Sequence, residues 1–199
     1  MKILDNINHT VREDLQDTMQ KGSRVSIAAA CFSIYAYQEL KKQLEEISEL
    51  RFIFTSPTFV QENTPKERRE FYIPKLTREK SLYGTEFEVR LRNELTQKAL
   101  AKECADWVRR KVKFRSNVSG EQMPGFMTVG ESSYMPISGF TTVDLGCERG
   151  NNAYYPVQRT EAFENGRYFL SLFDEIWNDS SRLQDVTDIV LQSISTAYR

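Results

Sequence analysis

Val25-Ser26-Ile27-Ala28-Ala29-Ala30-Cys31-Phe32 is an almost uninterrupted run of small, apolar and β-branched residues. A run of this length and composition predicts a strand that is buried on both faces. Leu50 to Thr55, closed by Pro57, predicts a second such strand. A helical stripe separates the two runs, formed by Tyr37, Leu40, Leu44 and Ile47. Strand, helix and strand within about 30 residues predict a right-handed crossover with parallel strands.

The segments on either side of this unit extend the pattern. Thr10 with Glu13 forms a capping box, which predicts a first helix that ends at Lys21-Gly22. Residues Phe59 to Tyr83 are polar and contain two prolines, so they predict an excursion over the surface. Start signals at Thr85 and Glu88 predict either one long helix or two consecutive ones, with an apolar face that reaches Val108.

The second half of the chain predicts three strands and two helices. The strands are expected at Lys111 to Ser116, Phe126 to Val129 and Tyr134 to Phe140. The apolar face of one closing helix runs from Phe163 to Trp177, and the other helix is expected behind a Ser181 cap, with Leu183, Val186 and Val190 on its face. The fold class predicted is α/β, with a mixed, largely parallel sheet flanked by helices on both faces in a single domain over residues 1–199.

Composition excludes several classes of protein. No apolar run approaches the roughly 20 residues of a membrane span, and the N-terminus lacks the apolar core of a secretory signal. We therefore expect a cytoplasmic protein without membrane contact. Cys31, Cys104 and Cys147 are widely spaced with no histidine nearby, which favours free thiols over a zinc site or a disulfide framework.

The net charge of −1 conceals an uneven distribution. Between Lys66 and Arg115 there are 15 Lys or Arg against eight acids, whereas Glu161 to Arg199 holds seven acids against three Arg. Such asymmetry can mark a nucleic-acid face, but acids interleaved with bases at helical spacing are also typical of solvated helices.

The order of several motifs resembles a known family. These motifs are the first strand quoted above, Arg51-Phe52-Ile53-Phe54, Arg90 to Gln97 with Ala101 to Val108, the Gly139-Phe140-Thr141 to Leu145-Gly146 turn, and Phe169 to Trp177. Over nearly its whole length the chain resembles the phospholipase D-like N-terminal region of large bacterial Swi/Snf-type ATP-dependent helicases. The resemblance implies a DNA-translocating motor that uses ATP and Mg²⁺ and follows beyond Arg199, and it allows a homodimer across a two-fold axis.

Phospholipase D-like phosphodiesterases carry a His-x-Lys motif, and this chain departs from it. If Ser138-Gly139-Phe140-Thr141 stands in place of the family's Ser-Asn-Phe-Thr, counting back places Gln122 near the histidine and Pro124 near the lysine. Neither residue can attack phosphorus or protonate a leaving group. The only histidine is His9, which is expected to be exposed or beside the first helix cap. The resemblance therefore implies a catalytically degenerate domain.

Other catalytic patterns do not occur in the sequence. It contains no Gly-x-x-x-x-Gly-Lys-Ser/Thr loop and no Gly-x-Ser-x-Gly turn, so neither ATP nor an activated serine is expected in this domain. Asp174-Glu175 is better explained as a solvated helix face than as a metal pair, because adjacent helical residues point about 100° apart. No cofactor or metal is expected here.

These observations predict a domain that binds or positions nucleic acid through phosphate contacts. The candidate residues are Arg68, Arg69, Lys75, Arg78, Lys80, Arg109, Arg110, Lys111, Lys113 and Arg115. Two alternatives remain open at this stage. One is a protein-interaction or homodimerisation module; the other is a nuclease with a rebuilt active site around Glu121, Glu131, Asp144 and Glu148.

Overall fold

Three neighbouring strands of the sheet run parallel to one another. The computed structural model describes residues 1–56, 94–150 and 154–196. Within these residues, β2 (Arg24–Ala29) pairs in parallel with β3 (Glu49–Phe54), and β3 pairs in parallel with β4 (Val112–Asn117). The register aligns Val25 with Leu50. The predicted crossover between two buried central strands is therefore confirmed.

The remaining strands extend this centre in the antiparallel sense. They are β5 (Phe126–Val129), β6 (Ser132–Met135), β7 (Val157–Thr160), β1 (Lys2–Leu4) and β8 (Leu183–Asp185). The order is β1-β7-β6-β5-β2-β3-β4-β8. Only two of the seven neighbouring pairs are parallel, so the prediction of a largely parallel sheet is wrong. One of the five antiparallel pairs has a local cause: β5 and β6 form a hairpin around Gly130 (φ 58°), and a hairpin joins only antiparallel strands.

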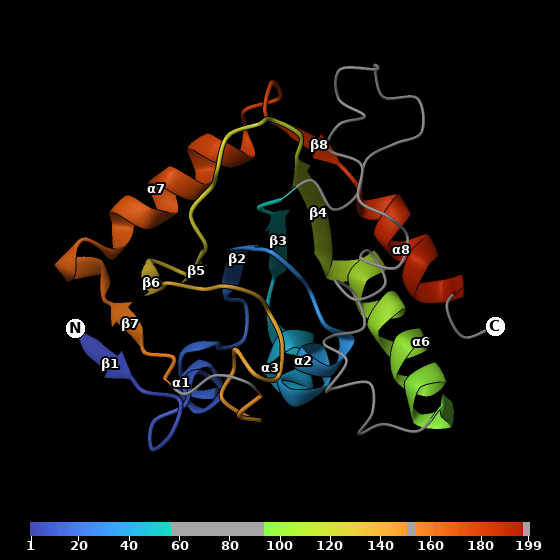
Figure 1. Cartoon of the computed structure of the whole chain (residues 1–199), viewed down its shortest axis with the longest axis horizontal. Coiled ribbons are helices and arrows are strands. Elements are labelled where there is room, and N and C mark those ends of the chain that lie inside the picture. Colours follow the sequence, from blue (N-terminus) through green and yellow to red (C-terminus); the bar gives the residue numbers. More distant parts are fainter. Residues whose placement is uncertain (57–93, 151–153, 197–199) are drawn as a thin grey trace.

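Helices cover both faces of this mixed sheet, as predicted, but unequally (Figure 1). One face packs against α1 (Val11–Thr18), α2 (Ile34–Glu39), α3 (Lys41–Glu46), α6 (Glu94–Lys111) and α8 (Thr187–Thr196). The other packs against α7 (Gly166–Trp177) in a smaller apolar cluster. Because side chains alternate along a strand, Ala28 of β2 and Ile53 of β3 enter the smaller cluster, whereas their neighbours in the same strands enter the larger one.

Aromatic packing joins α6 to the larger core. Phe32 lies against Phe52, Phe114 and Trp107, with ring centroids 5.6, 5.2 and 6.4 Å away. The indole of Trp107 is fully buried and donates to the Leu44 carbonyl at 2.8 Å. Trp107 therefore belongs to the core and cannot serve as a platform for stacked bases.

Several local predictions change. The helix expected through Tyr37 and Ile47 is two helices, because Leu40 leaves helical geometry between α2 and α3. The strand predicted from Tyr134 to Phe140 corresponds to β6, which ends at Met135. The next residue, Pro136, has no amide hydrogen to donate to a neighbouring strand. None of the helices in the described ranges combines the length and apolar content that a membrane span requires.

The C-terminal helices also begin later than expected. Phe163 lies in a short 3-10 turn (Ala162–Glu164) and is 87% exposed, so it is not on the apolar face of α7. Ser181 does not cap a helix, because its amide and hydroxyl both donate to Asp179. Leu183 lies in strand β8, and α8 starts only at Thr187.

Candidate nucleic-acid interface

Helix α6 separates an apolar face from a basic one. Leu100, Cys104, Trp107 and Val108 are buried against the sheet. Lys98, Lys102 and Arg109 are exposed and lie four and seven residues apart. Residues three, four or seven apart occupy the same side of a helix, so these three cations form one stripe.

This stripe borders a groove between α6 and α8, which lie side by side in Figure 1. The groove has a volume of about 330 Å³. Its lining consists of Lys98, Ala101, Lys102, Ala105, Asp106 and Arg109 from α6, and Ile194 and Ser195 from α8. It therefore combines an apolar floor with a cationic rim.

The three cations of the stripe differ in how firmly they are held. Arg109 pairs with Asp106 at 2.8 Å and also approaches the Ser195 hydroxyl at 3.5 Å. Among the described residues, neither Lys98 nor Lys102 has an ion-pair partner. Among the lining residues that the structure describes, Asp106 is the one carboxylate against three cations, an excess of two positive charges. Within the described ranges, no carboxylate therefore competes with an external anion for the two lysines.

The neighbouring cations predicted from the sequence hold the fold together. Arg110 pairs with Glu45 at 2.7 Å, and the Lys111 ammonium donates to the carbonyls of Glu45 and Ile47 at the end of α3. Burial raises the pKa of Glu45, but hydrogen bonds from Arg110 and Tyr37 outweigh it, so the pKa lies below its ordinary value. Arg110 and Lys111 therefore anchor α3 to α6.

Lys113 and Arg115 lie on the opposite face of the sheet. Their neighbours Val112 and Phe114 point into the larger core, so these two side chains point toward α7. The Arg115 guanidinium lies 4.1 Å from the ring centroid of Trp177 and donates to the Trp177 carbonyl. Lys113 is exposed. The five cations between 109 and 115 consequently do not form one surface, and the other five candidates, Arg68, Arg69, Lys75, Arg78 and Lys80, lie outside the described residues.

Sequence reasoning did not single out Lys98 and Lys102 as binding residues. Their spacing with Arg109 is the signal that could have found them. The sequence predicted the last helix but not its position beside α6, because that position depends on strand β8, which the pattern did not predict.

The region of the degenerate motif lies where strand β2 ends. Gln122 and Pro124 are exposed in the loop before β5, whose residue Phe126 pairs with Ala28 near the end of β2. Ser138 is exposed and its carbonyl accepts from Ala30, while the Phe140 amide donates to Cys31. The two parts of the motif therefore approach the same end of one strand from different loops.

A buried carboxylate fills the space beside Gly139. The Asp144 carboxylate accepts from the Thr141 hydroxyl at 2.7 Å, and from the Gly139 amide and the Tyr155 hydroxyl. Burial raises the pKa of Asp144, although these hydrogen bonds oppose the rise. A Cβ at position 139 would lie 2.6 Å from the Cys31 sulfur and 2.7 Å from an Asp144 oxygen. No side chain fits at Gly139 without displacing one of them.

The other acids of the hypothetical rebuilt site have separate structural partners. Glu121 pairs with Arg182, Glu131 with Arg167 and the Thr142 hydroxyl with Glu148. No group of three or more potential metal ligands is found among the described residues. His9 is exposed and its amide donates to Asp5, as expected for a residue beside the first cap.

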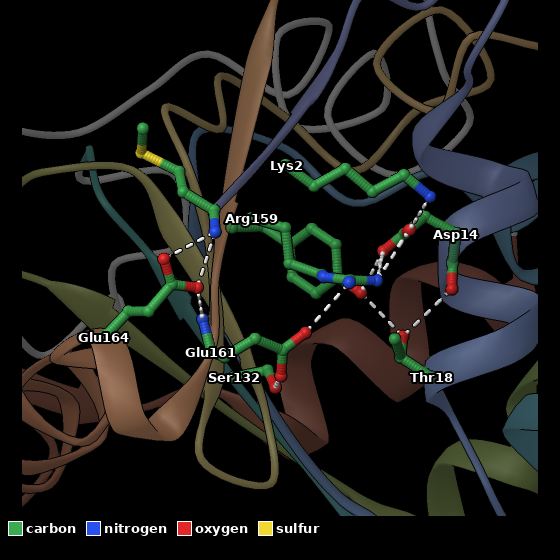
Figure 2. A network of polar contacts seen from close by, with 9 residues as sticks. Lys2, Asp14, Thr18, Ser132, Arg159, Glu161 and Glu164 are labelled. Carbon is green, nitrogen blue, oxygen red and sulfur yellow. Dashed lines mark hydrogen bonds and ion pairs between the residues drawn. The ribbon is translucent and has the colours of Figure 1, made fainter.

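A second polar cluster lies between α1 and the β1 edge of the sheet (Figure 2). The Asp14 carboxylate, whose side chain is 2% exposed, accepts from Arg159 at 2.8 and 3.0 Å, from the Tyr134 hydroxyl at 2.7 Å and from Lys2 at 3.1 Å. Arg159 also pairs with Glu161 at 2.9 Å. The bonds join α1 to β1, β6 and β7, and each charge meets an opposite one. The arrangement is that of a structural network.

Comparison of the chain with models of known families gave no match, and comparison with curated proteins gave none either.

Proposed function

We propose that this chain is a catalytically degenerate, phospholipase D-like accessory domain that binds nucleic acid within a longer helicase polypeptide. The observation that carries the binding part is the stripe on α6, where Lys98 and Lys102 have no anionic partner among the described residues and align with Arg109. Exposed cations on one helix face suit phosphates, which are contacted without reading sequence.

The region of the degenerate motif supports the non-catalytic part. An enzyme of the phospholipase D type needs an imidazole nucleophile and an open space for the phosphate. Here Gln122 and Pro124 supply no nucleophile, and Asp144 and Cys31 occupy the space beside Gly139. ATP and Mg²⁺ belong to the proposed motor, and no residue described here is assigned to them.

A salt titration tests the binding proposal. Fluorescence anisotropy with a labelled duplex should show an affinity that falls about 40-fold between about 50 and about 200 mM salt, the value for three phosphate contacts. For a single strand with the same three contacts the fall should be about 20-fold. An affinity that does not depend on salt, or no binding at about 50 mM salt, would contradict the proposal.

Exposed apolar side chains favour a second candidate, a protein-interaction or homodimerisation module. Ile3 on the edge strand β1 is 54% exposed and Phe163 is 87% exposed. The two segments that carry them are joined by an ion pair between the Met1 amino group and Glu164 at 2.5 Å. Sedimentation of wild type and of Ile3→Ser/Phe163→Ser would detect a dimer and its loss; a wild-type monomer at every concentration argues against homodimerisation.

A further inference from the structure

We propose that the groove between α6 and α8 selects single-stranded over duplex nucleic acid by seating one nucleotide unit, with its phosphates on Lys98 and Lys102. This inference rests on the proposed function and specifies both the site and the substrate class.

The size and lining of the groove indicate a ligand that is larger than a phosphate. Its volume of about 330 Å³ falls at the lower end of the range for small organic ligands, roughly 300 to 1,000 Å³. Ala101, Ala105 and Ile194 line it beside the cations. The two alanines leave room that longer side chains would fill. The ligand therefore has an anionic part and an adjoining organic part of low polarity, and a nucleotide has both.

The cations are placed for consecutive phosphates of one strand. Lys98 and Lys102 are separated by one helical turn, about 6 Å along the axis. Arg109 is held by Asp106 and Ser195 at the other end of the lining, so it fixes the limit of the groove while the two lysines adjust to the ligand.

The apolar floor distinguishes the two forms of nucleic acid. In a duplex the flat faces of the bases are stacked inside the helix, whereas a single strand can turn a base toward the protein. Only a single strand can therefore use the floor and the lysines together. None of the groove residues in the described part of the chain is aromatic, so the stacking gain of about 1–3 kcal/mol per base is missing. Binding should be weak and tolerant of sequence.

The experiment compares a labelled oligothymidine of about 15 nucleotides with the corresponding duplex by fluorescence anisotropy. Wild type should bind the single strand more tightly at the same salt concentration. Lys98→Ala/Lys102→Ala should reduce the slope of log affinity against log salt for the single strand by about 1.4, the value for two lost contacts. Lys21→Ala/Arg149→Ala removes two exposed cations elsewhere and should leave the slope unchanged.

A second variant tests the groove without removing a charge. Ser195 is exposed at the lip, and Ser195→Phe should fill the groove. We expect it to weaken single-strand binding at least 5-fold while duplex binding changes less than 2-fold, with dTMP competing only against wild type. Equal melting temperatures would confirm that the variants fold.

The outcomes separate the two proposals. If wild type binds no nucleic acid, the proposed function and this inference both fail. If wild type binds with steep salt dependence but prefers duplex, or if Ser195→Phe and Lys98→Ala/Lys102→Ala bind like wild type, the groove inference alone is overturned and nucleic acid binds elsewhere on the domain.

Discussion

Replacement of Arg159 by methionine probes the network around Asp14. The change leaves a carboxylate that is 2% exposed with two of its three partners, Tyr134 and Lys2. Loss of one member of a buried ion pair costs about 3–5 kcal/mol. We expect the lower end, about 3 kcal/mol, because Lys2 and Tyr134 remain and the Arg159 side chain is itself 20% exposed.

Urea unfolding followed by circular dichroism measures this loss of stability. In a thermal scan, about 3 kcal/mol corresponds to a melting temperature lower by about 6–12 °C for a chain of this size. Asp14→Leu should also destabilise the protein. The double variant Asp14→Leu/Arg159→Met leaves no buried charge without a partner. Its loss in the free energy of unfolding should therefore be at least about 2 kcal/mol smaller than the sum of the losses of the two single variants.

An exposed ion pair provides the matched control. Arg167 and Glu131 are also 2.8 Å apart, but their side chains are 72% and 49% exposed. Arg167→Met should change the free energy of unfolding by less than about 1 kcal/mol. If Arg159→Met costs no more than this control, or if the two network substitutions are simply additive, the description of Asp14 as the buried centre of the network is refuted.

Three other predictions follow from the motif region and from α3. Gly139→Asn should destabilise the protein by about 1–3 kcal/mol in urea because its Cβ would collide with Cys31 and Asp144, whereas Ser138→Ala should be nearly neutral; equal stabilities would contradict the packing. Glu45→Gln should destabilise the protein at neutral pH. The difference in unfolding free energy between this variant and wild type should shrink as the pH falls below about 4.5, because the pKa of Glu45 is lowered in the folded protein. A difference that does not change with pH would argue against a stabilising carboxylate. Purified protein should not hydrolyse bis(p-nitrophenyl) phosphate above background, with or without divalent metal, and turnover that a point substitution in this domain abolishes would favour a rebuilt active site.

The elements that the sequence predicted well are those whose pattern is complete within a few residues. The Thr10 cap is one example, since its hydroxyl accepts from the Glu13 amide at 3.1 Å. The run from Val25 is another example, because a strand buried on both faces is read directly from a continuous apolar run and needs no alternation of polar and apolar residues. Phe126–Val129 is found at its predicted bounds.

The elements that were missed depend on distant partners. β1, β7 and β8 have three or four residues each, and neighbouring strands from remote parts of the chain supply their hydrogen bonds. The candidate site was likewise predictable in its local part but not in the part that depends on distant residues. The basic residues of α6 are evident in the sequence, but only the packing shows that Arg110 and Lys111 serve α3 while Lys98 and Lys102 face a groove.

The order of strands also has a consequence for synthesis on the ribosome. β1 forms one edge of the sheet and β8 the other, although they come from opposite ends of the described chain. The central strands β2, β3 and β4 leave the exit tunnel early, yet α7, β8 and α8, which cover them and close the edge, follow only after residue 165. At about 5–20 residues per second, a nascent chain spends several seconds with an open edge and a bare apolar face. During that interval it is a candidate for chaperone capture, and it cannot complete its sheet until β8 (Leu183–Asp185) has left the tunnel.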